Sequence, residues 1–355
     1  MKMEDLRRKI DDADAKIVRL IVERMKIAAA IGEEKKKLGK QIVDAERERK
    51  VLEKVSSIAR RENIRQEDIE NIYQQIVTAC RGIQSTGVAF QGEVGAYSEE
   101  AAFRFFGSSV QVKPCESLDD VFRVVGQGEF PFGIVPVENS LEGIISRVYD
   151  LLLESELRVY GEIELRVIHC LIAGQGARLD TIKRVYSHPQ ALGQCQAFLK
   201  HLDCELIPTY DTAGSVRMIK EQGIVDGAAI AGARAAEIYG MKIIASEIED
   251  NPNNFTRFFI LSPQDSPPSG NDKTSVVFSV KHKPGALYDA IKAFAAKNIN
   301  LTKIESRPTR QKAWEYNFYL DFEGHRQDNV SQEALANLEE ASLFVKIQGS
   351  YPKAK

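Results

Sequence analysis

Residues 85–98 read Ser-Thr-Gly-Val-Ala-Phe-Gln-Gly-Glu-Val-Gly-Ala-Tyr-Ser, and the sequence changes character at this stretch. The apolar run 88–90 predicts a strand, Gly92 and Gly95 predict a turn, and Ser98 predicts the start of a helix. A strand, a glycine turn and a helix in succession are typical of an α/β sheet. We therefore expect the fold to change near residue 85.

Residues 1–84, before this stretch, carry apolar side chains three or four positions apart, which predicts an all-helical segment. The helices are expected from about Leu6 to Ile31, from about Asp44 to Arg61, and from about Gln66 to Gln84. A first helix of about thirty residues would span ~45 Å, which is too long for a small bundle to bury. We expect its apolar stripe to pack along a second chain, giving a homodimer or a higher homo-oligomer.

Beyond residue 85, short apolar runs alternate with turns and amphipathic stretches, which predicts an α/β domain over residues 86–262. Residues 263–272 are rich in proline, serine and glycine, a composition that neither packs nor continues a sheet, so a linker is expected there. Residues 273–355 show the order βαββαβ, which predicts an α+β, ferredoxin-like module.

The composition excludes several classes of protein. A formal net charge of -3 and a pI near 6.1 give no global field for nucleic acid or an anionic membrane. The five cysteines are odd in number and form no Cys-x-x-Cys pair, which argues against a disulfide framework or a zinc site. We find no signal or membrane-spanning segment and no Gly-x-Gly-x-x-Gly fingerprint. We expect a cytoplasmic protein without metal or cofactor, and without nucleic-acid or membrane partners.

Polar residues at helical spacing could line one pocket in the helical segment. They are Arg7, Arg24, Lys35, Asp44, Arg47, Glu48, Cys80 and Gln84. Arg24 and Lys35 lie three turns apart and project from one side of the first helix. Arg7 is rotated by roughly 100 degrees from Arg24, so we expect it to serve a neighbouring subunit. Any one of these cations alone would more often be a solvated surface charge.

The motifs Leu6-Arg-x-x-Ile-Asp11, Glu23-Arg24, Gly32-x-x-Lys35 and Asp44-x-x-Arg-Glu48 resemble the all-helical chorismate mutases over the whole segment. The resemblance implies rearrangement of chorismate to prephenate, an intramolecular shift that needs positioning and electrostatics but no nucleophile. By this resemblance the carboxylates are held by Arg24, Arg47 and the partner subunit's Arg7. It also implies that Lys35 and Gln84 donate to the ether oxygen, and that Glu48 and Asp44 orient the ring hydroxyl and the cations. Cys80 departs from a serine in some members, and a thiol donates weakly.

Polar clusters follow apolar runs in residues 86–262. They are Ser98, Glu138-Asn-Ser140, Ser187-His-Pro-Gln190 with Gln194, Asp211-Thr212, and Asn253-Asn-Phe-Thr-Arg-Phe258. Each alone could be a helix cap. Their combination and order resemble the prephenate dehydratases, whose signature includes Thr-Arg-Phe, from about Val88 to Leu261. The resemblance implies two α/β lobes around a cleft, similar to type II periplasmic binding proteins.

The same resemblance implies that Thr256 assists departure of the ring hydroxyl, while Glu138, Asn139 and Gln194 line the catalytic cleft. It implies that the substrate is bound or positioned by Ser98, Ser187, Thr212 and Arg257. A threonine hydroxyl is too weak an acid to ionise near neutral pH, so it must act through a hydrogen bond or a relay, plausibly with Glu138. His188 precedes a proline in a loop and is the less favoured acid, despite the suitable pKa of histidine.

Two motifs lie at turns of the βαββαβ segment: Gly285-Ala286-Leu287 and Glu305-Ser306-Arg307-Pro308. Each could be simple turn chemistry. Together they resemble the phenylalanine-binding ACT domain, which implies that the module binds phenylalanine between subunits and lowers the dehydratase activity.

The favoured interpretation is a bifunctional, phenylalanine-regulated enzyme that converts chorismate to prephenate and prephenate to phenylpyruvate. Two alternatives stay open. One is a non-catalytic amino-acid sensor, since a two-lobed cleft and a regulatory module can simply bind ligands. The other is a mutase fused to a prephenate-consuming dehydrogenase, which would need the nucleotide fingerprint that is missing.

Overall fold

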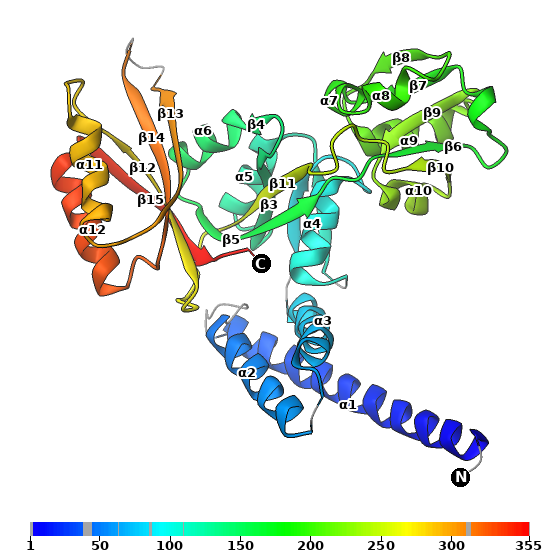
Figure 1. Cartoon of the computed structure of the whole chain (residues 1–355), viewed down its shortest axis with the longest axis horizontal. Coiled ribbons are helices and arrows are strands. Elements are labelled where there is room, and N and C mark those ends of the chain that lie inside the picture. Colours follow the sequence, from blue (N-terminus) through cyan, green and yellow to red (C-terminus); the bar gives the residue numbers. More distant parts are fainter. Residues whose placement is uncertain are drawn as a thin grey trace. The chain divides into compact units, whose positions relative to one another are not determined.

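The computed structural model describes residues 3–37, 45–62, 64–84, 87–108, 110–309 and 314–354. The chain divides into two compact units (Figure 1). The first is formed by residues 1–87 and 103–111, and the second by residues 88–102 and 112–355. Among the described residues, no helix is long and apolar enough to cross a bilayer.

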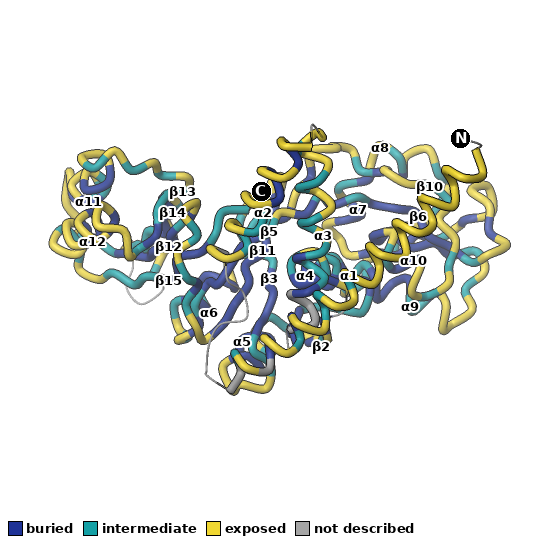
Figure 2. Tube along the Cα trace, turned by 90° about the horizontal axis from the view of Figure 1, so that it is seen from below, coloured by how far each residue is buried: buried dark blue, intermediate teal, exposed yellow. Residues whose placement is uncertain are grey.

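The first unit is helical, as predicted for this segment. It consists of α1 (Met3–Lys37), α2 (Ala45–Arg61) and α3 (Gln66–Gln84), and both α1 and α2 pack on α3. The described part of residues 1–20 is exposed throughout, which Figure 2 shows as a continuous yellow run along α1. This exposure includes apolar side chains, with Leu20 64% and Ile10 60% exposed. The apolar stripe of α1 is therefore not buried within its own chain.

The second unit begins with a lobe built on a mixed sheet of order β2-β1-β3-β11-β5, with β4 beside β3. Its strands are β1 (Val88–Gln91), β2 (Val112–Cys115), β3 (Phe132–Asn139), β4 (Gly143–Ile144), β5 (Arg158–Arg166) and β11 (Phe255–Ser262). Its helices are α4 (Tyr97–Phe106), whose last four residues belong to the first unit, α5 (Leu118–Gly126) and α6 (Ser146–Glu154). The late strand β11 lies antiparallel between β3 and β5, so the chain returns to this first lobe after building another.

The second lobe has a five-stranded sheet of order β10-β6-β9-β7-β8. Its strands are β6 (Cys170–Ala173), β7 (Arg184–Ser187), β8 (Glu205–Pro208), β9 (Gly227–Ala231) and β10 (Lys242–Ser246). Its helices are α7 (Pro189–Gly193), α8 (Gln196–Leu199), α9 (Thr212–Gln222), α10 (Ala233–Tyr239) and a 3-10 turn, Leu179–Thr181. The chain crosses between the lobes at residues 167–169 and 247–254, and the crossings are bonded where Val167 N donates to Asn254 O at 2.8 Å.

The C-terminal module has the predicted βαββαβ order. It contains β12 (Asp272–Ser279), α11 (Ala286–Ala295), β13 (Leu301–Pro308), β14 (Tyr316–Glu323), α12 (Asn329–Ala341) and β15 (Phe344–Pro352). The antiparallel sheet has the order β13-β14-β12-β15. Phe278 and Phe322 pack with the helices, whereas Tyr319 and Tyr351 belong to the same buried cluster as Val159 and Phe259 of the first lobe. This module and the first lobe therefore share a hydrophobic core.

Most residues of the expected linker, 263–272, are exposed or half-buried, but the segment is anchored at two points. Ser266 and Asp272 are buried, and Asp272 already pairs with Pro352 as the first residue of β12. The carboxylate of Asp272 accepts hydrogen bonds from Ser269 N at 2.8 Å and Gly270 N at 3.0 Å. The polar side chains of this segment satisfy its own backbone, so a turn-rich composition is compatible with an ordered connection.

The backbone of Gly349 in β15 lies very close to β5 of the first lobe. A methyl group at this position would collide with the carbonyl oxygen of Val159 and would lie 2.8 Å from its amide nitrogen. Both contacts are with backbone, which cannot rotate away. Glycine is therefore required where the C-terminal sheet meets the first lobe.

We expect Gly349→Ala to lower the free energy of unfolding of the second unit by about 1–3 kcal/mol, because an overpacked contact forces backbone shifts. The measurement is the unfolding midpoint of the full chain by scanning calorimetry. Gly126→Ala is the matched control, since a methyl group there meets open space. Equal midpoints for the two variants would contradict this account of the contact.

Candidate functional site

The ends of β3 and β11 place two pairs of polar residues on opposite faces of the first-lobe sheet. Thr256 is paired with Asn139, and Arg257 is paired with Glu138. Successive residues of a strand point to opposite faces, so each cross-strand pair shares one face. Thr256 and Asn139 therefore lie on one side of the sheet, and Arg257 and Glu138 lie on the other.

The hydrogen bonds of Asn139 fix how the hydroxyl of Thr256 can act. The Asn139 Oδ1 atom accepts from the backbone N–H groups of Leu141 at 3.0 Å and Glu142 at 3.1 Å, so its Nδ2 faces Thr256. This Nδ2 donates to Thr256 Oγ1 at 3.1 Å. Because Oγ1 accepts from Asn139, the proton of the hydroxyl is available for donation to another group.

A chain of hydrogen bonds leads from this pair to the second lobe. Asn139 Nδ2 donates to Asn254 Oδ1 at 2.7 Å, and Asn254 Nδ2 donates to Gln194 Oε1 at 2.9 Å. Gln194 Oε1 also lies 3.0 Å from His169 Nε2. The chain thus joins β3, both crossings between the lobes, and the end of α7, and it fixes Thr256 relative to Gln194.

His169 is almost fully buried and forms the far end of this chain of hydrogen bonds. Its Nδ1 lies 2.9 Å from the hydroxyl oxygen of Tyr97. Since Gln194 Oε1 can only accept, Nε2 carries a proton. When the ring is neutral, Nδ1 is an acceptor and shares the one hydroxyl proton of Tyr97 with the carbonyl oxygen of Ile168, to which Tyr97 donates at 2.8 Å. Burial lowers the pKa of His169, against the opposing effects of Gln194 and Glu249, and so favours the neutral ring. Burial also raises the pKa of Tyr97 well above its usual range.

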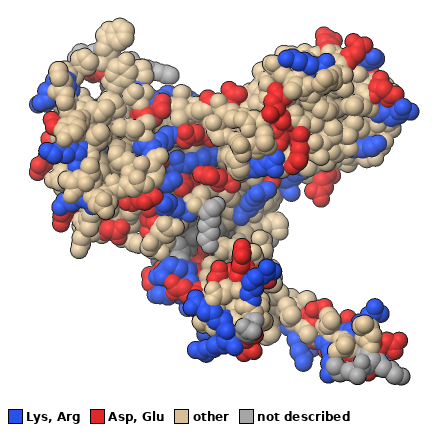
Figure 3. Space-filling model, viewed as in Figure 1, with Lys and Arg blue, Asp and Glu red and all other residues tan. Residues whose placement is uncertain are grey.

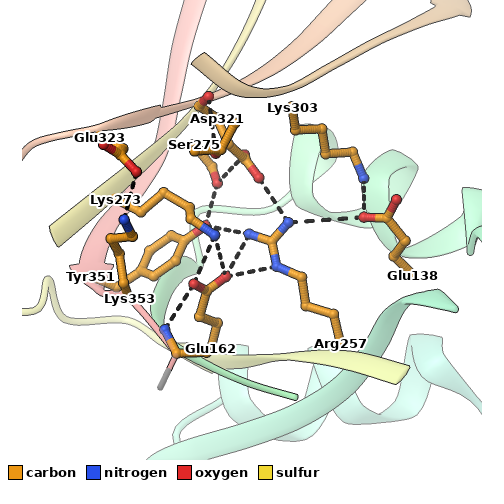
Figure 4. A network of polar contacts seen from close by, with 12 residues as sticks. Glu138, Glu162, Arg257, Lys273, Ser275, Lys303, Asp321, Glu323, Tyr351 and Lys353 are labelled. Atoms are coloured by element: carbon orange, nitrogen blue, oxygen red, sulfur yellow. Dashed lines mark hydrogen bonds and ion pairs between the residues drawn. The ribbon is translucent and has the colours of Figure 1, made fainter. Parts of the chain in front are cut away.

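Arg257 and Glu138 face the C-terminal module (Figure 4). The Arg257 guanidinium donates to Glu162 at 2.7 Å, to Asp321 at 2.8 Å and to the hydroxyl of Tyr351 at 3.1 Å. Glu138 accepts from Lys303 at 2.7 Å. The structure therefore does not bring Glu138 to Thr256, and Asn139 takes the neighbouring place that the sequence suggested for Glu138 in a relay.

Ser98 and Thr212 both lie at helix starts where the two lobes meet. Ser98 is buried in the first turn of α4, and its neighbour Glu99 pairs with Arg234 of the second lobe at 2.8 Å. Thr212 opens α9, which Asp211 caps by accepting from Gly214 N at 2.7 Å. Helix starts present backbone N–H groups suited to an anionic ligand.

Two polar residues of the second lobe have internal partners. The hydroxyl of Ser187 is fully buried and donates to Ile230 O at 2.6 Å, so it joins β7 to β9. His188 caps α7, where its Nδ1 accepts from Gln190 N at 3.3 Å. Both contacts help to hold the loop that carries Gln194.

In the helical unit, Arg24 Nη1 lies 2.6 Å from Cys80 Sγ, so α1 and α3 meet at these two predicted residues. Lys35 and Glu48 are half-buried, whereas Arg47 and Arg7 are exposed. Gln84 is the last residue of α3. Asp44 and the side chain of Gln84 lie outside what the structure describes.

In the C-terminal module, Gly285 adopts a positive φ of 83° immediately before α11, and Ala286 and Leu287 form the first turn of that helix. Glu305 and Ser306 lie on β13 and face opposite sides of the sheet. Arg307 is buried, donating to Ser146 O at 2.7 Å and pairing with Asp150 at 2.9 Å. Arg307 therefore contacts the first lobe.

Sequence reasoning missed Asn254, His169 and Lys303 as parts of these networks. Asn254 was visible as a polar residue entering a strand, and His169 as a histidine between two apolar runs. Neither spacing nor composition indicates that they meet. Among the described residues, no group of three His, Cys, Asp or Glu side chains is placed to hold a metal ion. Figure 3 shows cationic and anionic side chains interspersed on the face in view.

Comparison with known proteins covers all three segments. Three family models match, described as chorismate mutase type II over residues 6–85, prephenate dehydratase over residues 88–266, and ACT domain over residues 274–340. The bifunctional chorismate mutase/prephenate dehydratase of Aquifex aeolicus is 39% identical over 360 residues, covering 99% of this chain and 98% of the relative.

Solved structures resemble the second unit. Prephenate dehydratase from Arthrobacter aurescens in complex with L-Phe has a TM-score of 0.70 at 32% identity, covering 75% of this chain and 90% of that one. GqqA, described as a quorum-quenching acylase, has a TM-score of 0.70 at 33% identity, covering 75% and 97%. Since this fold is found with a different described activity, the fold alone does not establish function, and the full-length relative carries more weight.

We expect acidification to destabilise the second unit through His169. Its pKa in the folded chain lies below the usual value of about 6.5, so the unfolded chain binds the proton more readily as the pH falls. The stabilisation is present above about pH 6.5 and is lost as the pH falls through the folded pKa. His169→Phe should reduce the decline of the unfolding midpoint between about pH 7 and pH 5. The exposed His201, changed to Phe, is the control, and an unaltered decline in His169→Phe would contradict the assignment.

Proposed function

Since the chain belongs to the family of bifunctional chorismate mutase/prephenate dehydratases, we propose how its own residues carry out the family's two reactions. The enzyme rearranges chorismate to prephenate and then converts prephenate to phenylpyruvate with loss of water and carbon dioxide. Its ACT module places the formation of phenylpyruvate under regulation by phenylalanine. The sensor and dehydrogenase interpretations are set aside, because the chain matches the family models of chorismate mutase and of prephenate dehydratase.

For the mutase reaction, the helical unit positions a dianion and stabilises charge on its ether oxygen. Arg24, Arg47 and the partner subunit's Arg7 bind the carboxylates, and Lys35 with Gln84 donates to the oxygen as its bond to carbon breaks. Glu48 and Asp44 orient the ring hydroxyl and the cations. The contact between Arg24 and Cys80 supports a positioning role for the thiol, which accepts from the guanidinium rather than donating to substrate.

The apolar stripe of α1 supports a homodimer or higher homo-oligomer. An exposed stripe along a helix of 35 residues is the kind of surface that a second copy of the same helix covers. Arg7 lies on the exposed part of α1, which supports its assignment to the partner subunit's site. We place the enzyme in the cytoplasm, with chorismate, prephenate and phenylalanine as its small-molecule partners.

For the dehydratase reaction, Thr256 donates a hydrogen bond to the ring hydroxyl of prephenate as the carbon–oxygen bond breaks. The ring hydroxyl takes up a proton that reaches it from solvent through the Thr256 hydroxyl, so its carbon–oxygen bond breaks and it leaves as water. The ring carboxylate leaves as carbon dioxide, and the electrons of the broken carbon–carbon bond complete the aromatic ring. The carrying observation is that Thr256 Oγ1 accepts from Asn139, which leaves its O–H free to donate. Asn139 and Gln194 hold this geometry, while Ser98 and Thr212 offer helix starts to the carboxylates.

Substitutions in the two units should separate the two activities. Thr256→Ala removes the hydroxyl donor, so we expect prephenate to accumulate from chorismate and phenylpyruvate formation to fall at least about a hundredfold, within the usual range for an acid–base group. Lys35→Ala should abolish chorismate consumption and spare the conversion of added prephenate. Products are identified by liquid chromatography. Undiminished phenylpyruvate formation by Thr256→Ala would remove Thr256 from the mechanism.

Mixing two inactive mutases tests whether Arg7 serves the partner's site. In a heterodimer of Arg7→Ala and Lys35→Ala chains, one site carries both defects and the other carries neither. Refolding an equimolar mixture should therefore restore about a quarter of the wild-type mutase rate, because about half of the dimers are mixed and each mixed dimer has one intact site out of two. Arg24→Ala with Lys35→Ala is the control and should restore nothing if both act within one chain. If the mixture of Arg7→Ala and Lys35→Ala chains restores no mutase activity, the proposal that Arg7 serves the partner's site is rejected.

A further inference from the structure

Arg257 bridges the dehydratase sheet and the ACT sheet through a single guanidinium (Figure 4). It starts from β11 and donates to Glu162 of β5 on its own sheet. It also donates to Asp321 of β14 and to Tyr351 of β15, both in the ACT module. Ser275 of β12 joins the ACT partners, bonding Asp321 Oδ1 and the Tyr351 hydroxyl at 2.6 Å each. One side chain of the dehydratase therefore contacts two strands of the regulatory sheet, and a third strand holds both contact residues in place.

Lys303 of β13 makes a second bridge close to the first. Its Nζ donates to Glu138 at 2.7 Å and to the Tyr149 hydroxyl at 2.8 Å. Glu138 lies 3.9 Å from Arg257 Nη1, which joins the two bridges into one network. Lys303 also lies two residues before Glu305 on the same strand face. The proposed phenylalanine motif and the bridge to the dehydratase thus share β13.

The network is balanced in charge and largely buried, with the Glu138 side chain, 35% exposed, as its most open member. Three cations, Arg257, Lys273 and Lys303, meet three anions, Glu138, Glu162 and Asp321. The Glu162 side chain is 1% exposed and that of Arg257 is 11% exposed. Removing one member of such a network leaves an uncompensated buried charge, so its partners resist moving apart. The two sheets are therefore joined by ion pairs, which favour one relative position of the sheets, as well as by apolar contacts.

We propose that Arg257 and Glu138 are positioning residues through which the ACT module sets the geometry of Thr256 and Asn139. This inference rests on the role proposed above for Thr256. Arg257 follows Thr256 in β11, and Glu138 precedes Asn139 in β3, so each network residue is covalently attached to a residue of the cleft. When phenylalanine shifts β13 or β14, the network moves these strand ends, and a misplacement of ~1 Å at reacting groups can cost about a hundredfold in rate.

The test uses the full-length enzyme and the ratio of dehydratase kcat/KM without and with saturating phenylalanine. In Lys303→Met the ACT sheet loses its ion pair with Glu138. This inhibition ratio should therefore fall about tenfold or more, within the usual size of allosteric coupling. Lys303→Arg keeps the cation and should retain most of the inhibition. Lys297→Met is the matched control, because Lys297 pairs with Glu333 within the ACT module and should leave the ratio unchanged.

Asp321→Asn provides a second variant of nearly the same shape, and calorimetry with phenylalanine confirms that the effector still binds each protein. Non-additive changes of the ratio in a cycle of Lys303→Met and Glu138→Gln would show that the two act through each other. An unchanged ratio in both Lys303→Met and Asp321→Asn overturns the proposal. Loss of phenylalanine binding also overturns it, because these residues would then be part of the effector site.

Failure of the proposed function is distinguishable from failure of this inference. A wild-type enzyme that makes no phenylpyruvate from prephenate would reject the function itself, whatever the variants do. Mutase activity, measured on the same samples, reports how much of each chain has a folded helical unit, and the unfolding midpoint reports on the second unit, which carries the substitutions. A merely structural role for the network would lower the unfolding midpoint of the variants without changing the inhibition ratio.

Discussion

The antiparallel pairing of β11 with β3 is the constraint on which the second unit depends. The chain leaves the first lobe after β5, builds a separate sheet, and returns to insert β11 between β3 and β5. This return creates the two crossings between the lobes and places Asn254 and Thr256 beside Asn139. Because a strand alternates its side chains, the same pairing places Thr256 and Asn139 on one face of the sheet, and Arg257 and Glu138 on the face toward the regulatory module.

The two faces of this pairing use different physical chemistry. On the Thr256 side, the hydrogen bonds join amides, a threonine hydroxyl and a histidine whose pKa is lowered by burial. The nearest carboxylates, Glu142 and Glu249, contact Gln194 and the backbone of His169 at the far end of this chain of hydrogen bonds. On the other side, full charges are buried in mutual contact. Charge networks of this kind specify one arrangement of their partners more than they add stability. This property suits the proposed role of the network, which is to transmit a movement of the ACT sheet to the dehydratase sheet.

The helical unit follows another strategy. Its α1 exposes an apolar stripe instead of burying it, and the guanidinium of Arg24 is paired with Cys80 of α3. A pericyclic rearrangement needs electrostatic positioning rather than a proton donor or nucleophile, so cations on helices suffice. The dehydratase reaction needs a proton donor at a leaving group, and the residues that we propose for it lie at strand ends, where hydrogen bonds define the direction of the Thr256 hydroxyl. The two activities therefore sit on scaffolds suited to their chemistry.

The sequence by itself determined the helices of the first unit, the βαββαβ module and the family motifs, because periodicity and residue order are properties of the chain alone. It also placed Thr256 and Arg257 side by side, and alternation requires them to face opposite ways. Only the tertiary structure decided that Thr256 faces Asn139 while Arg257 faces Asp321 and Tyr351, and that Asn254 and His169 complete the cleft network. These contacts join residues far apart in the chain, and pairing register, which no local pattern encodes, sets which face each residue occupies.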